Sequence, residues 1–438
     1  MIRISLPGTT QNDFDDAIQV LEECKAKIVP CLGFEYPFMG PGGQYGNCWW
    51  ERDTSLTLSG YKWVDQEFAE NVLRNFMLVQ KLNGRIPLWG FDRVGDYDEE
   101  LSAIPVLFEV ALKVLKRSLN IDLISNVYTM LGKYMEWWLS DVKRDPETGL
   151  VCGIFEESDP SDFEKQLTAA QVDLNVQICV GADVLREFAD FLKLPADALR
   201  WHSVFQQQKA LINRYLYDPE SGGYFTYLVK ERRLMKERVY NSMLDTFKRN
   251  IVPADRRAGL IRFLESRDHF DLYGKYSIVT ASRTSPEYQE TVGVYKGWTS
   301  WSGNIWTFRN EIIATGLNEA GEKELAAEVA YRTVKEFSGN YAEFLSPSTG
   351  QGHGVERYGW TASQYMSLII EELFGVNDDL WNGSIDVKPN IPAALTGVEL
   401  SLEGLPVGKP GPDGSRHALC VRAIRRPDGN IEAEKRIE

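Results

Sequence analysis

Two acidic loops, far apart in the chain, hold the side chains best suited to chemistry in this sequence. The first, Phe155–Phe163, reads FEESDPSDF, and the second, Glu343–Trp360, reads EFLSPSTGQGHGVERYGW. Hydrolysis of a glycosidic bond with inversion needs two carboxyl groups, one protonated for the leaving oxygen and one ionised to activate water. Their surroundings must push the two pKa values apart. We therefore expect the two loops to face each other across a sugar-binding pocket.

Glu343 is the better defined of the candidate acids. It follows Tyr341 in a largely apolar neighbourhood and precedes a Pro/Thr/Gly turn and a glycine-rich loop. The alternative is a solvent-exposed loop glutamate, and the local sequence favours neither. Four carboxylates compete in the first loop, namely Glu156, Glu157, Asp159 and Asp162. Clustering raises the pKa of at least one member, as a general acid requires, although acidic surface loops are also common.

Arg52 and Asp53 directly follow Trp49-Trp50 and could form a fork for sugar hydroxyls. The alternative is an acidic residue at a helix N-terminus with a charge partner. Several aromatic residues in loops could stack on a sugar, and each could equally fill the core. These aromatic candidates are Trp89, Phe91, Trp298, Trp301 and Trp306.

The composition limits the classes of function. The 438 residues are 43% hydrophobic and 25% charged, with a formal charge of −15. A net negative charge disfavours nucleic acid and anionic membranes as partners. The six cysteines show no CxxC pairing and the four histidines are scattered, so we expect no metal and no cofactor. The cysteine pattern, together with an N-terminus unlike a signal peptide, predicts a cytoplasmic protein that does not span a membrane. A homo-oligomer is compatible with this composition.

Hydrophobic periodicity predicts a mostly helical chain with long Gly/Pro/aromatic loops on alternate connections. About twelve helices fit, which suits an all-α fold of the (α/α)6 barrel type with its long loops at one end. We expect this barrel in residues 1–378. Alternating apolar and polar residues predict a small β-strand appendage in residues 379–438, with a frayed end. The predicted helices cover residues 13–29, 64–82, 101–115, 123–139, 172–192, 199–216, 252–264, 298–317, 322–337 and 362–373, with a further one opening near Asp53.

The order of several motifs resembles that of the clan G inverting glycoside hydrolases. The motifs are WWERDTS, NGRIP, EESDPSDF, VDLN, YGKYSIVTASRTSPEY, YKGWTSWSGNIW, EFLSPSTG and YGWTAS. The clan holds family 63, with processing α-glucosidase and mannosylglycerate hydrolase relatives, and the family 37 trehalases. The resemblance runs through roughly residues 45–375. It implies an (α/α)6 barrel and hydrolysis of an α-glycoside with inversion.

The resemblance also implies roles for single residues. The general base of such enzymes precedes a Pro-x-Thr-Gly turn and a Gly-Trp-Thr helix start, which are represented here by Glu343 and Trp360. Their general acid lies in a Glu-Ser-Gly-Trp-Asp-Asn-Ser segment before Val-Asp-Leu-Asn. This chain has Glu157–Ser161 there, without the Gly-Trp pair. Closing that gap makes Asp159 the acid, with Glu157 and Asp162 as alternatives.

A second likeness is to the family 15 glucoamylases. Their Trp-x-Arg-Asp-Ser segment, in which the Arg-Asp pair holds the nonreducing sugar, is similar to Trp50–Ser55. Their acid is the first Glu of a Trp-Glu-Glu triplet, so Phe155-Glu156-Glu157 makes Glu156 a further alternative. The family 63 segment YWRGPVW appears here as YKGWTSW, with Lys296 in place of the arginine. That departure bears on the identity of the substrate.

We therefore predict an inverting, exo-acting α-glycosidase, similar to α-glucosidases, that hydrolyses a small α-linked oligosaccharide or glycoside. Glu343 would activate water and Asp159 would protonate the leaving oxygen. The residues expected to hold the sugar are Trp50, Arg52, Asp53, Trp89, Glu157, Trp298, Trp301 and Trp360. Alternatives are a trehalase, or a glycosylglycerate hydrolase that binds the glycerate carboxylate through Lys296, Arg283 or Arg357. From another class, the alternative is an inactive carbohydrate-binding protein.

Overall fold

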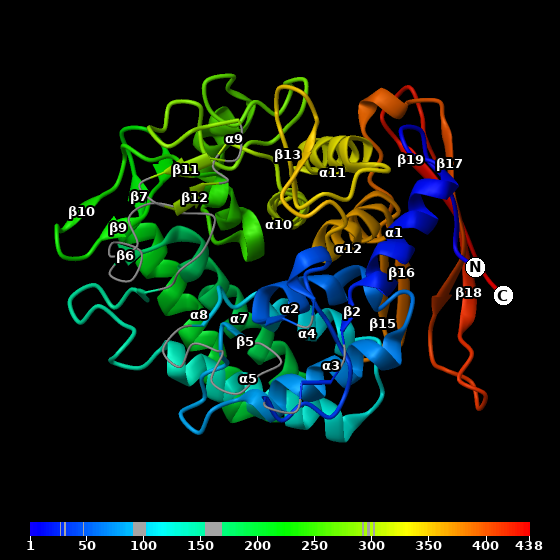
Figure 1. Ribbon diagram of the computed structural model, residues 1–438, viewed down its shortest axis with the longest axis horizontal. Helices are drawn as coiled ribbons and strands as arrows, with labels where there is room; N and C mark the ends of the chain where they lie inside the picture. Colours follow the sequence, from blue (N-terminus) through cyan, green and yellow to red (C-terminus); the bar gives the residue numbers. More distant parts are fainter. Residues whose placement is uncertain are drawn as a thin grey trace.

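The computed structural model describes residues 1–26, 28–29, 32–46, 48–90, 102–153, 169–290, 293–295, 298–300 and 303–438. Only the backbone is described for residues 44, 293–295 and 298–300. The chain is mostly helical, as predicted, and a sheet lies at one side of the helices (Figure 1).

Six helical elements contact one another in a cyclic order and form an inner ring. Each element packs against the next, and the last packs against the first. In this order they are α2 (Glu51–Tyr61), α4 (Leu107–Leu115), α7 (Val172–Phe191), η3 (Asn241–Asn250), α10 (Thr307–Glu319) and α12 (Gly359–Ser367).

A second set of helices packs against this ring from outside. Pairs adjacent in sequence are also adjacent in space, such as α7 with α8 and α10 with α11. The outer helices are α1 (Gln11–Glu23), α3 (Gln66–Val79), α5 (Ile121–Trp138), α8 (Pro195–Tyr215), α9 (Arg257–Glu265) and α11 (Lys323–Phe337).

Burial differs between the two layers. Outer helix α1 buries only Phe14, Ala17, Val20 and Leu21, which recur at the three- and four-residue spacing of one helix face. Its N-terminus is held by a capping box between Thr10 and Asp13. Inner helix α2 instead buries every residue from Glu51 to Tyr61, polar ones included. The inner ring therefore carries buried polar side chains that need partners.

Several predicted helices are wrong at one end. The helix predicted for residues 101–115 begins only at Leu107, and the one predicted for residues 252–264 begins at Arg257, after a 3₁₀ turn. The helix predicted for residues 13–29 ends at Glu23, because Lys25–Ala26 (β2) pairs with Phe38–Met39 (β3). The helix predicted for residues 298–317 begins only at Thr307. Its first residues form β12 (Trp298–Ser300), which pairs with β11 (Gly293–Tyr295), as aromatic and β-branched residues favour. The last predicted helix begins earlier, at Gly359, and continues as a π-helix, η5 (Leu368–Leu373).

Short strand pairs join the loops that enter and leave the inner ring. They are β4 (Trp49–Trp50) with β5 (Trp89–Gly90), β6 (Ala169–Ala170) with β9 (Tyr227–Leu228), β9 with β10 (Arg233–Leu234), β7 (Tyr217–Asp218) with β8 (Gly223–Tyr224), and β13 (Phe344–Leu345) with β14 (Gly352–His353). Single 3₁₀ turns lie at η2 (Gly43–Tyr45), η4 (Ala254–Arg256) and η6 (Ala393–Leu395).

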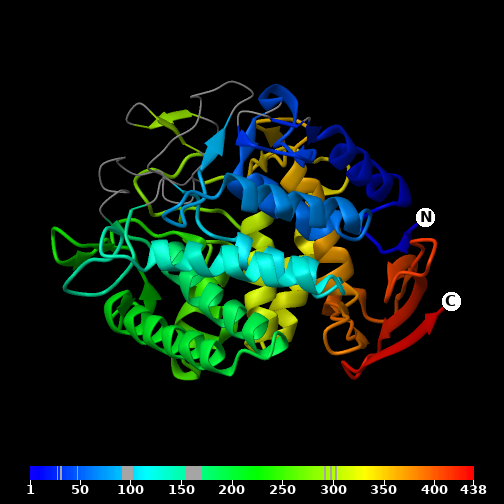
Figure 2. The same ribbon diagram turned by 90° about the horizontal axis from the view of Figure 1, so that it is seen from below.

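The main sheet has four antiparallel strands in the order β1-β17-β18-β19. Figures 1 and 2 both show it on one side of the helices, beside the two ends of the chain. Three strands come from the region predicted to hold strands, and β19 forms where a frayed end was predicted. The strands are β1 (Arg3–Ser5), β17 (Glu399–Val407), β18 (His417–Arg425) and β19 (Ile431–Ile437), and a separate hairpin joins β15 (Val376–Asp379) to β16 (Ser384–Val387).

A polar cavity of about 150 Å³ lies where α2, α4, η3 and α10 end. Lys62 and Lys113 both form salt bridges with Glu371 there, and Lys248 pairs with Glu109. Burial opposes the charge of Glu371, but the two lysines outweigh it and lower the pKa of Glu371 to about 2. This end of the ring is therefore a network of paired charges.

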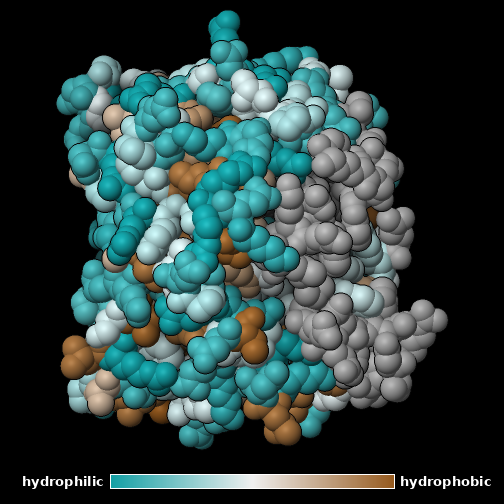
Figure 3. All heavy atoms as spheres, turned by 90° about the vertical axis from the view of Figure 1, so that its left-hand side faces the viewer, coloured by the Kyte–Doolittle hydropathy of each residue, from teal (hydrophilic) through white to brown (hydrophobic). Residues whose placement is uncertain are grey.

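No helix among the described residues is both long and apolar enough to cross a membrane. In the same part of the chain, no group of three or more His, Cys, Asp or Glu side chains could hold a metal ion. The coloured residues of the face in Figure 3 are mostly hydrophilic, with hydrophobic side chains scattered in small groups.

Two helix glycines should respond in opposite directions to alanine. Gly60 of α2 donates its N–H to Ser363 Oγ of α12 at 2.8 Å, and an added Cβ would collide with the Ser363 carbonyl. Gly60→Ala should lower the free energy of unfolding by about 1–3 kcal/mol. Gly132 of α5 has only Trp201 near its Cβ position, at 3.9 Å, so Gly132→Ala should raise it by about 0.5–1 kcal/mol. Urea unfolding of both variants tests this, and equal effects would contradict the close packing of α2 on α12.

Candidate active site

Glu343 lies immediately before β13, and its carboxyl group is held by its own hairpin. Its backbone N–H donates to the Val355 carbonyl at 2.8 Å, and the Val355 N–H donates back to Oε2 of Glu343 at 3.1 Å. Gly354 has φ of +74°, and a side chain there would collide with the Glu343 carboxylate. The glycine-rich loop therefore leaves room for a buried acid, which is only 4% exposed.

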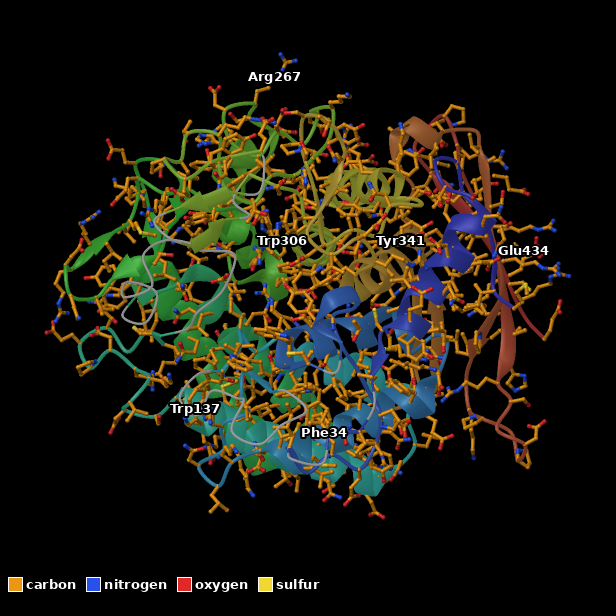
Figure 4. The ribbon with its side chains drawn as sticks, viewed as in Figure 1. Phe34, Trp137, Arg267, Trp306, Tyr341 and Glu434 are labelled. Atoms are coloured by element: carbon orange, nitrogen blue, oxygen red, sulfur yellow. The ribbon has the colours of Figure 1, made fainter. Side chains whose placement is uncertain are left out.

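This hairpin is attached to the beginnings of two inner helices. Leu345 and Ile305 exchange backbone hydrogen bonds of 2.9 and 3.0 Å just before α10. The Thr361 hydroxyl of α12 donates to the Ala342 carbonyl at 2.9 Å. Phe344 stacks on Trp306, with ring centroids 5.4 Å apart. Figure 4 places Trp306 and Tyr341 deep among the helices, whereas Glu434 lies on the sheet at the margin of the molecule.

Arg52 and Asp53 lie on the first turn of α2 and reach α10 and α12. The guanidinium of Arg52 lies over the ring of Phe308, 4.3 Å from its centroid. Oδ1 of Asp53 accepts a 2.6 Å hydrogen bond from the Tyr358 hydroxyl, just before α12. Phe308 in turn packs on Trp360 with centroids 5.0 Å apart. Arg52, Asp53 and Trp360, predicted as sugar-binding residues from separate motifs, thus come together in one cluster.

Trp50 and Trp89 form a pair on the strands β4 and β5. Their ring centroids are 5.7 Å apart and their planes are inclined by 32°. Trp50 and Trp89 are both half-buried, whereas Trp360 is only 1% exposed and lies within the aromatic cluster around Trp306. Trp50 and Trp89 therefore offer accessible ring surface, whereas Trp360 is packed inside the aromatic cluster.

The base of the acidic loop is fixed to the start of α7. Asn175, from the VDLN motif, donates to the Val151 carbonyl at 2.9 Å and accepts from the Val151 N–H at 3.0 Å. The Gly153 N–H donates to the Ala169 carbonyl, so the chain leaves and returns at neighbouring points. The predicted acids Glu156, Glu157, Asp159 and Asp162 lie outside the described residues, as does Trp301, and only the backbone of Trp298 is described.

The beginnings of the inner elements meet at one end of the ring. Asp53 of α2 contacts Tyr358 before α12, and Trp360 of α12 contacts Trp306 before α10. Arg309 of α10 forms hydrogen bonds of 3.0 and 2.6 Å with Asp245 of η3. Helix N-termini carry partial positive charge, which favours anionic groups such as carboxylates nearby. Both ends of the acidic loop and the Glu343 hairpin are attached at this end.

Several buried polar atoms here lack a hydrogen-bond partner among the described residues. They belong to the first turn or the N-cap of different inner helices, which no single structural defect would explain. Buried polar groups in proteins are normally hydrogen-bonded, so each of these atoms calls for an explanation. The atoms are the indole N–H groups of Trp50 and Trp360, both carboxyl oxygens of Glu51, the side-chain amide of Gln171 and the hydroxyl of Thr307.

Two cations proposed for a glycerate carboxylate already have carboxylate partners. Arg357 pairs with Asp16 and Glu23 on α1, at 3.0 and 2.7 Å. Arg283 forms salt bridges with Asp271 and Glu290, at 3.3 and 3.2 Å. The third proposed cation, Lys296, lies outside the described residues.

Sequence motifs identified Glu343, Arg52, Asp53 and Trp360, but not every residue that positions them. Tyr358, which holds Asp53, lies within the YGWTAS motif but was not assigned a role, and Phe308, which packs on Arg52, lies just after a named motif. Element η3 was missed because its sequence, NSMLDTFKRN, is polar on average and forms a 3₁₀ helix that is interrupted by non-helical backbone at Lys248 and Arg249. The feature that marks η3 is the buried ion pair between Asp245 and Arg309. Only the fold brings these two residues together, so the sequence alone does not reveal it.

Comparison with known proteins shows which proteins this chain is similar to. Residues 153–361 match the mannosylglycerate hydrolase MGH1-like glycoside hydrolase domain, a range that includes the acidic loop and Glu343. Mannosylglycerate hydrolase of Thermus thermophilus is 27% identical over 150 residues, which are 34% of this chain and 33% of that protein. The matched segment thus spans about a third of the curated relative.

Solved structures show a similar fold. The family 63 mannosylglycerate hydrolase of Thermus thermophilus, in complex with glucose, has a TM-score of 0.66 and 18% identity over 81% of this chain and 98% of that chain. Neutral trehalase of Saccharomyces cerevisiae has a TM-score of 0.61 and 16% identity over 76% of this chain and 73% of that chain. The resemblance to the clan G glycoside hydrolases is confirmed, and residues 153–361 are similar to the mannosylglycerate hydrolase MGH1-like glycoside hydrolase domain.

Proposed function

We propose that this protein is an inverting, exo-acting α-glycosidase that hydrolyses a small α-linked glucoside or a related glycoside. The observation that carries this proposal is the position of Glu343. Its buried carboxylate is fixed by a backbone N–H, on a hairpin attached to the same helix beginnings as Arg52 and Asp53. A carboxylate fixed beside hydroxyl-binding groups is what a general base for water requires.

The architecture that we propose is an (α/α)6 barrel in residues 1–378, with a β appendage in residues 379–438. The cyclic contacts of α2, α4, α7, η3, α10 and α12 support the barrel, as do the outer helices packed against them. The likeness to the mannosylglycerate hydrolase fold supports it independently. The N-terminal strand β1 pairs with β17 and would belong to the appendage sheet.

In the proposed reaction Asp159 protonates the leaving oxygen while Glu343 takes a proton from the attacking water. The product is the sugar with inverted anomeric configuration. Arg52 and Asp53 would hold hydroxyls of the terminal sugar, and Trp50 and Trp89 would offer apolar ring surface to its C–H face. Asp159 follows from the resemblance of its segment, and Glu156, Glu157 and Asp162 remain the alternatives.

A glycosylglycerate is the second candidate substrate, and the family match favours it. The domain model and the curated relative are both named for mannosylglycerate hydrolases. A glycerate carboxylate would need a cation, and Arg357 and Arg283 would first have to leave their carboxylate partners. Trehalose is supported by fold likeness alone.

The test is release of sugar from a panel of α-linked disaccharides, trehalose, glucosylglycerate and mannosylglycerate, followed by proton NMR. An inverting enzyme releases the β-anomer first. Each of the four acids is replaced by its amide. Asp159→Asn should show the largest loss of kcat. This loss should be small on an α-glycosyl fluoride, whose leaving group needs no proton. Initial release of the α-anomer would overturn inversion. Sugar binding without turnover of any substrate would indicate a carbohydrate-binding protein instead.

A further inference from the structure

Glu51 is a buried acid that the proposed reaction does not use. It is the first residue of α2, directly before Arg52 and Asp53. Its side chain is 0% exposed, and neither carboxyl oxygen has a hydrogen-bond partner within the part of the chain that the structure describes. Leaving a buried polar group unpaired opposes folding, and most buried carboxyl groups are paired or bonded. An unpaired acid beside the proposed sugar-binding residues therefore calls for a functional explanation.

Charged and titratable groups interact with Glu51 from its own helix and from α5. Arg52 and Asp53 act on it from its own helix. From α5, Tyr134 lies close enough for a charge on Glu51 to raise its pKa, and Arg85, in the loop before β5, acts on that same tyrosine. Two neutral groups of the described residues lie near the Tyr134 hydroxyl: Ser102 Oγ at 2.5 Å and the Ala103 carbonyl at 3.4 Å. No cation among the described residues is bonded to the Glu51 carboxyl group, so a negative charge there would be poorly compensated.

Burial controls the protonation of this acid. Burial, opposed by Arg52 and assisted by Asp53, raises the pKa of Glu51 to about 8. At pH 7 the group is therefore mostly a neutral carboxylic acid, which explains how the fold tolerates it without a partner. In this state Glu51 carries no charge that would attract Arg52, whose guanidinium lies over Phe308 of α10.

We propose that Glu51 is a positioning residue of the sugar site that works as a neutral acid, and that its ionisation draws Arg52 away from the sugar. This rests on the proposed function, because it assigns Arg52 to sugar binding. An ionised Glu51 would be a buried negative charge beside Arg52, and the guanidinium is the cation nearest to it in sequence. Asp53 would stay in place through its hydrogen bond from Tyr358. The expected consequence is weaker binding of the sugar at alkaline pH, with the chemical step less affected.

Glu51→Gln is the decisive variant, because glutamine has the same shape but cannot ionise. With a substrate that the wild type hydrolyses, KM and kcat are measured from pH 6 to pH 10. Wild-type KM should rise above about pH 8, by up to tenfold per pH unit, while kcat changes less. Glu51→Gln should keep KM within about threefold of the wild-type value at pH 7 and remain flat to pH 10. An unchanged alkaline rise in Glu51→Gln would overturn the proposal, and so would a large rise in its KM at pH 7.

A stability measurement separates this proposal from the proposed function. The folded pKa of Glu51, about 8, is above the ordinary value of about 4.3 expected for the unfolded chain. The folded state therefore keeps a proton that the unfolded state loses between these values. Relative to Glu51→Gln, the folding equilibrium constant of the wild type should fall by up to tenfold per pH unit from about pH 4.5 to pH 8, and then level off.

Glu67→Gln, which changes an exposed carboxylate on the outer helix α3, is the matched control. The ratio of the folding equilibrium constants of the wild type and Glu67→Gln should not change with pH. A flat ratio for Glu51→Gln, or failure of this neutral isostere to fold, would refute the neutral state even in an active enzyme. If stability shows the expected pH dependence but no substrate is hydrolysed, the neutral state of Glu51 is supported and the proposed function is rejected.

Discussion

Glu343→Gln is expected to lower kcat by about 10²–10⁴-fold, the usual contribution of a general base. Glutamine keeps the shape of the side chain, and its carbonyl oxygen can still accept the 3.1 Å hydrogen bond from the Val355 N–H. It cannot take a proton from the attacking water. KM should change little, because the groups proposed to bind the sugar are untouched. Initial rates on the substrate found in the panel test this.

Glu356→Gln is the matched control, since Glu356 is an exposed carboxylate just beyond the same hairpin. It should keep kcat within about twofold of wild type, because surface substitutions seldom disturb a distant buried group. Urea unfolding of both variants shows whether the fold is intact. Retention of more than a tenth of wild-type kcat by Glu343→Gln would remove Glu343 from the reaction.

Arg309→Met is expected to lower the free energy of unfolding by about 3–5 kcal/mol, because it leaves a buried carboxylate without its cation. Arg309 donates to both carboxyl oxygens of Asp245, and both side chains are almost completely buried. Burial raises the pKa of Asp245 to about 6 even though Arg309 opposes this shift. Without the arginine the folded state should bind a proton at higher pH, and the loss of stability should grow as the pH rises.

Two comparisons identify the cause of this loss. Arg200→Met removes an exposed salt bridge to Glu136, of 2.9 Å, and should cost only about 0–1 kcal/mol. The double variant Arg309→Met with Asp245→Leu removes both buried charges and should recover more than half of the loss. Urea unfolding at pH 5 and pH 8 measures all of these. A loss below about 1 kcal/mol for Arg309→Met would show that the pair is not needed to hold η3 on α10.

The outer helices could be predicted from the sequence better than the inner ring. Helix α1 has one apolar face, whose spacing is visible in the sequence, whereas α2 is buried all round and its ERDT start reads as polar. An inner helix is stabilised by partners on other elements, such as Tyr358 for Asp53. Element η3 is likewise held by Arg309 of α10, which its own sequence does not reveal.

The candidate site shows a similar division. Motif order led to Glu343, Arg52, Asp53 and Trp360, and the structure brings the last three into one cluster beside the hairpin of the first. Motifs do not report which carboxyl group lacks a partner. Glu51 reads in the sequence as an ordinary acid at a helix start. Both Glu51 and Asp53 are buried, but Asp53 accepts a hydrogen bond from Tyr358, whereas the Glu51 carboxyl group has no partner among the described residues. Its protonation state is therefore a property of the fold.

The pairing of β1 with β17 has a consequence for how the chain is made. Arg3 lies opposite Glu403, so strand β1 pairs with a strand that is synthesised 400 residues later. At about 5–20 residues per second, β1 waits for roughly 20–80 s. During that time Ile2 and Leu6, buried in the finished protein, have no sheet to cover them. The helices can pack as they emerge, whereas β1 depends on β17, so a chain that terminates before β17 would leave Ile2 and Leu6 without their covering strand.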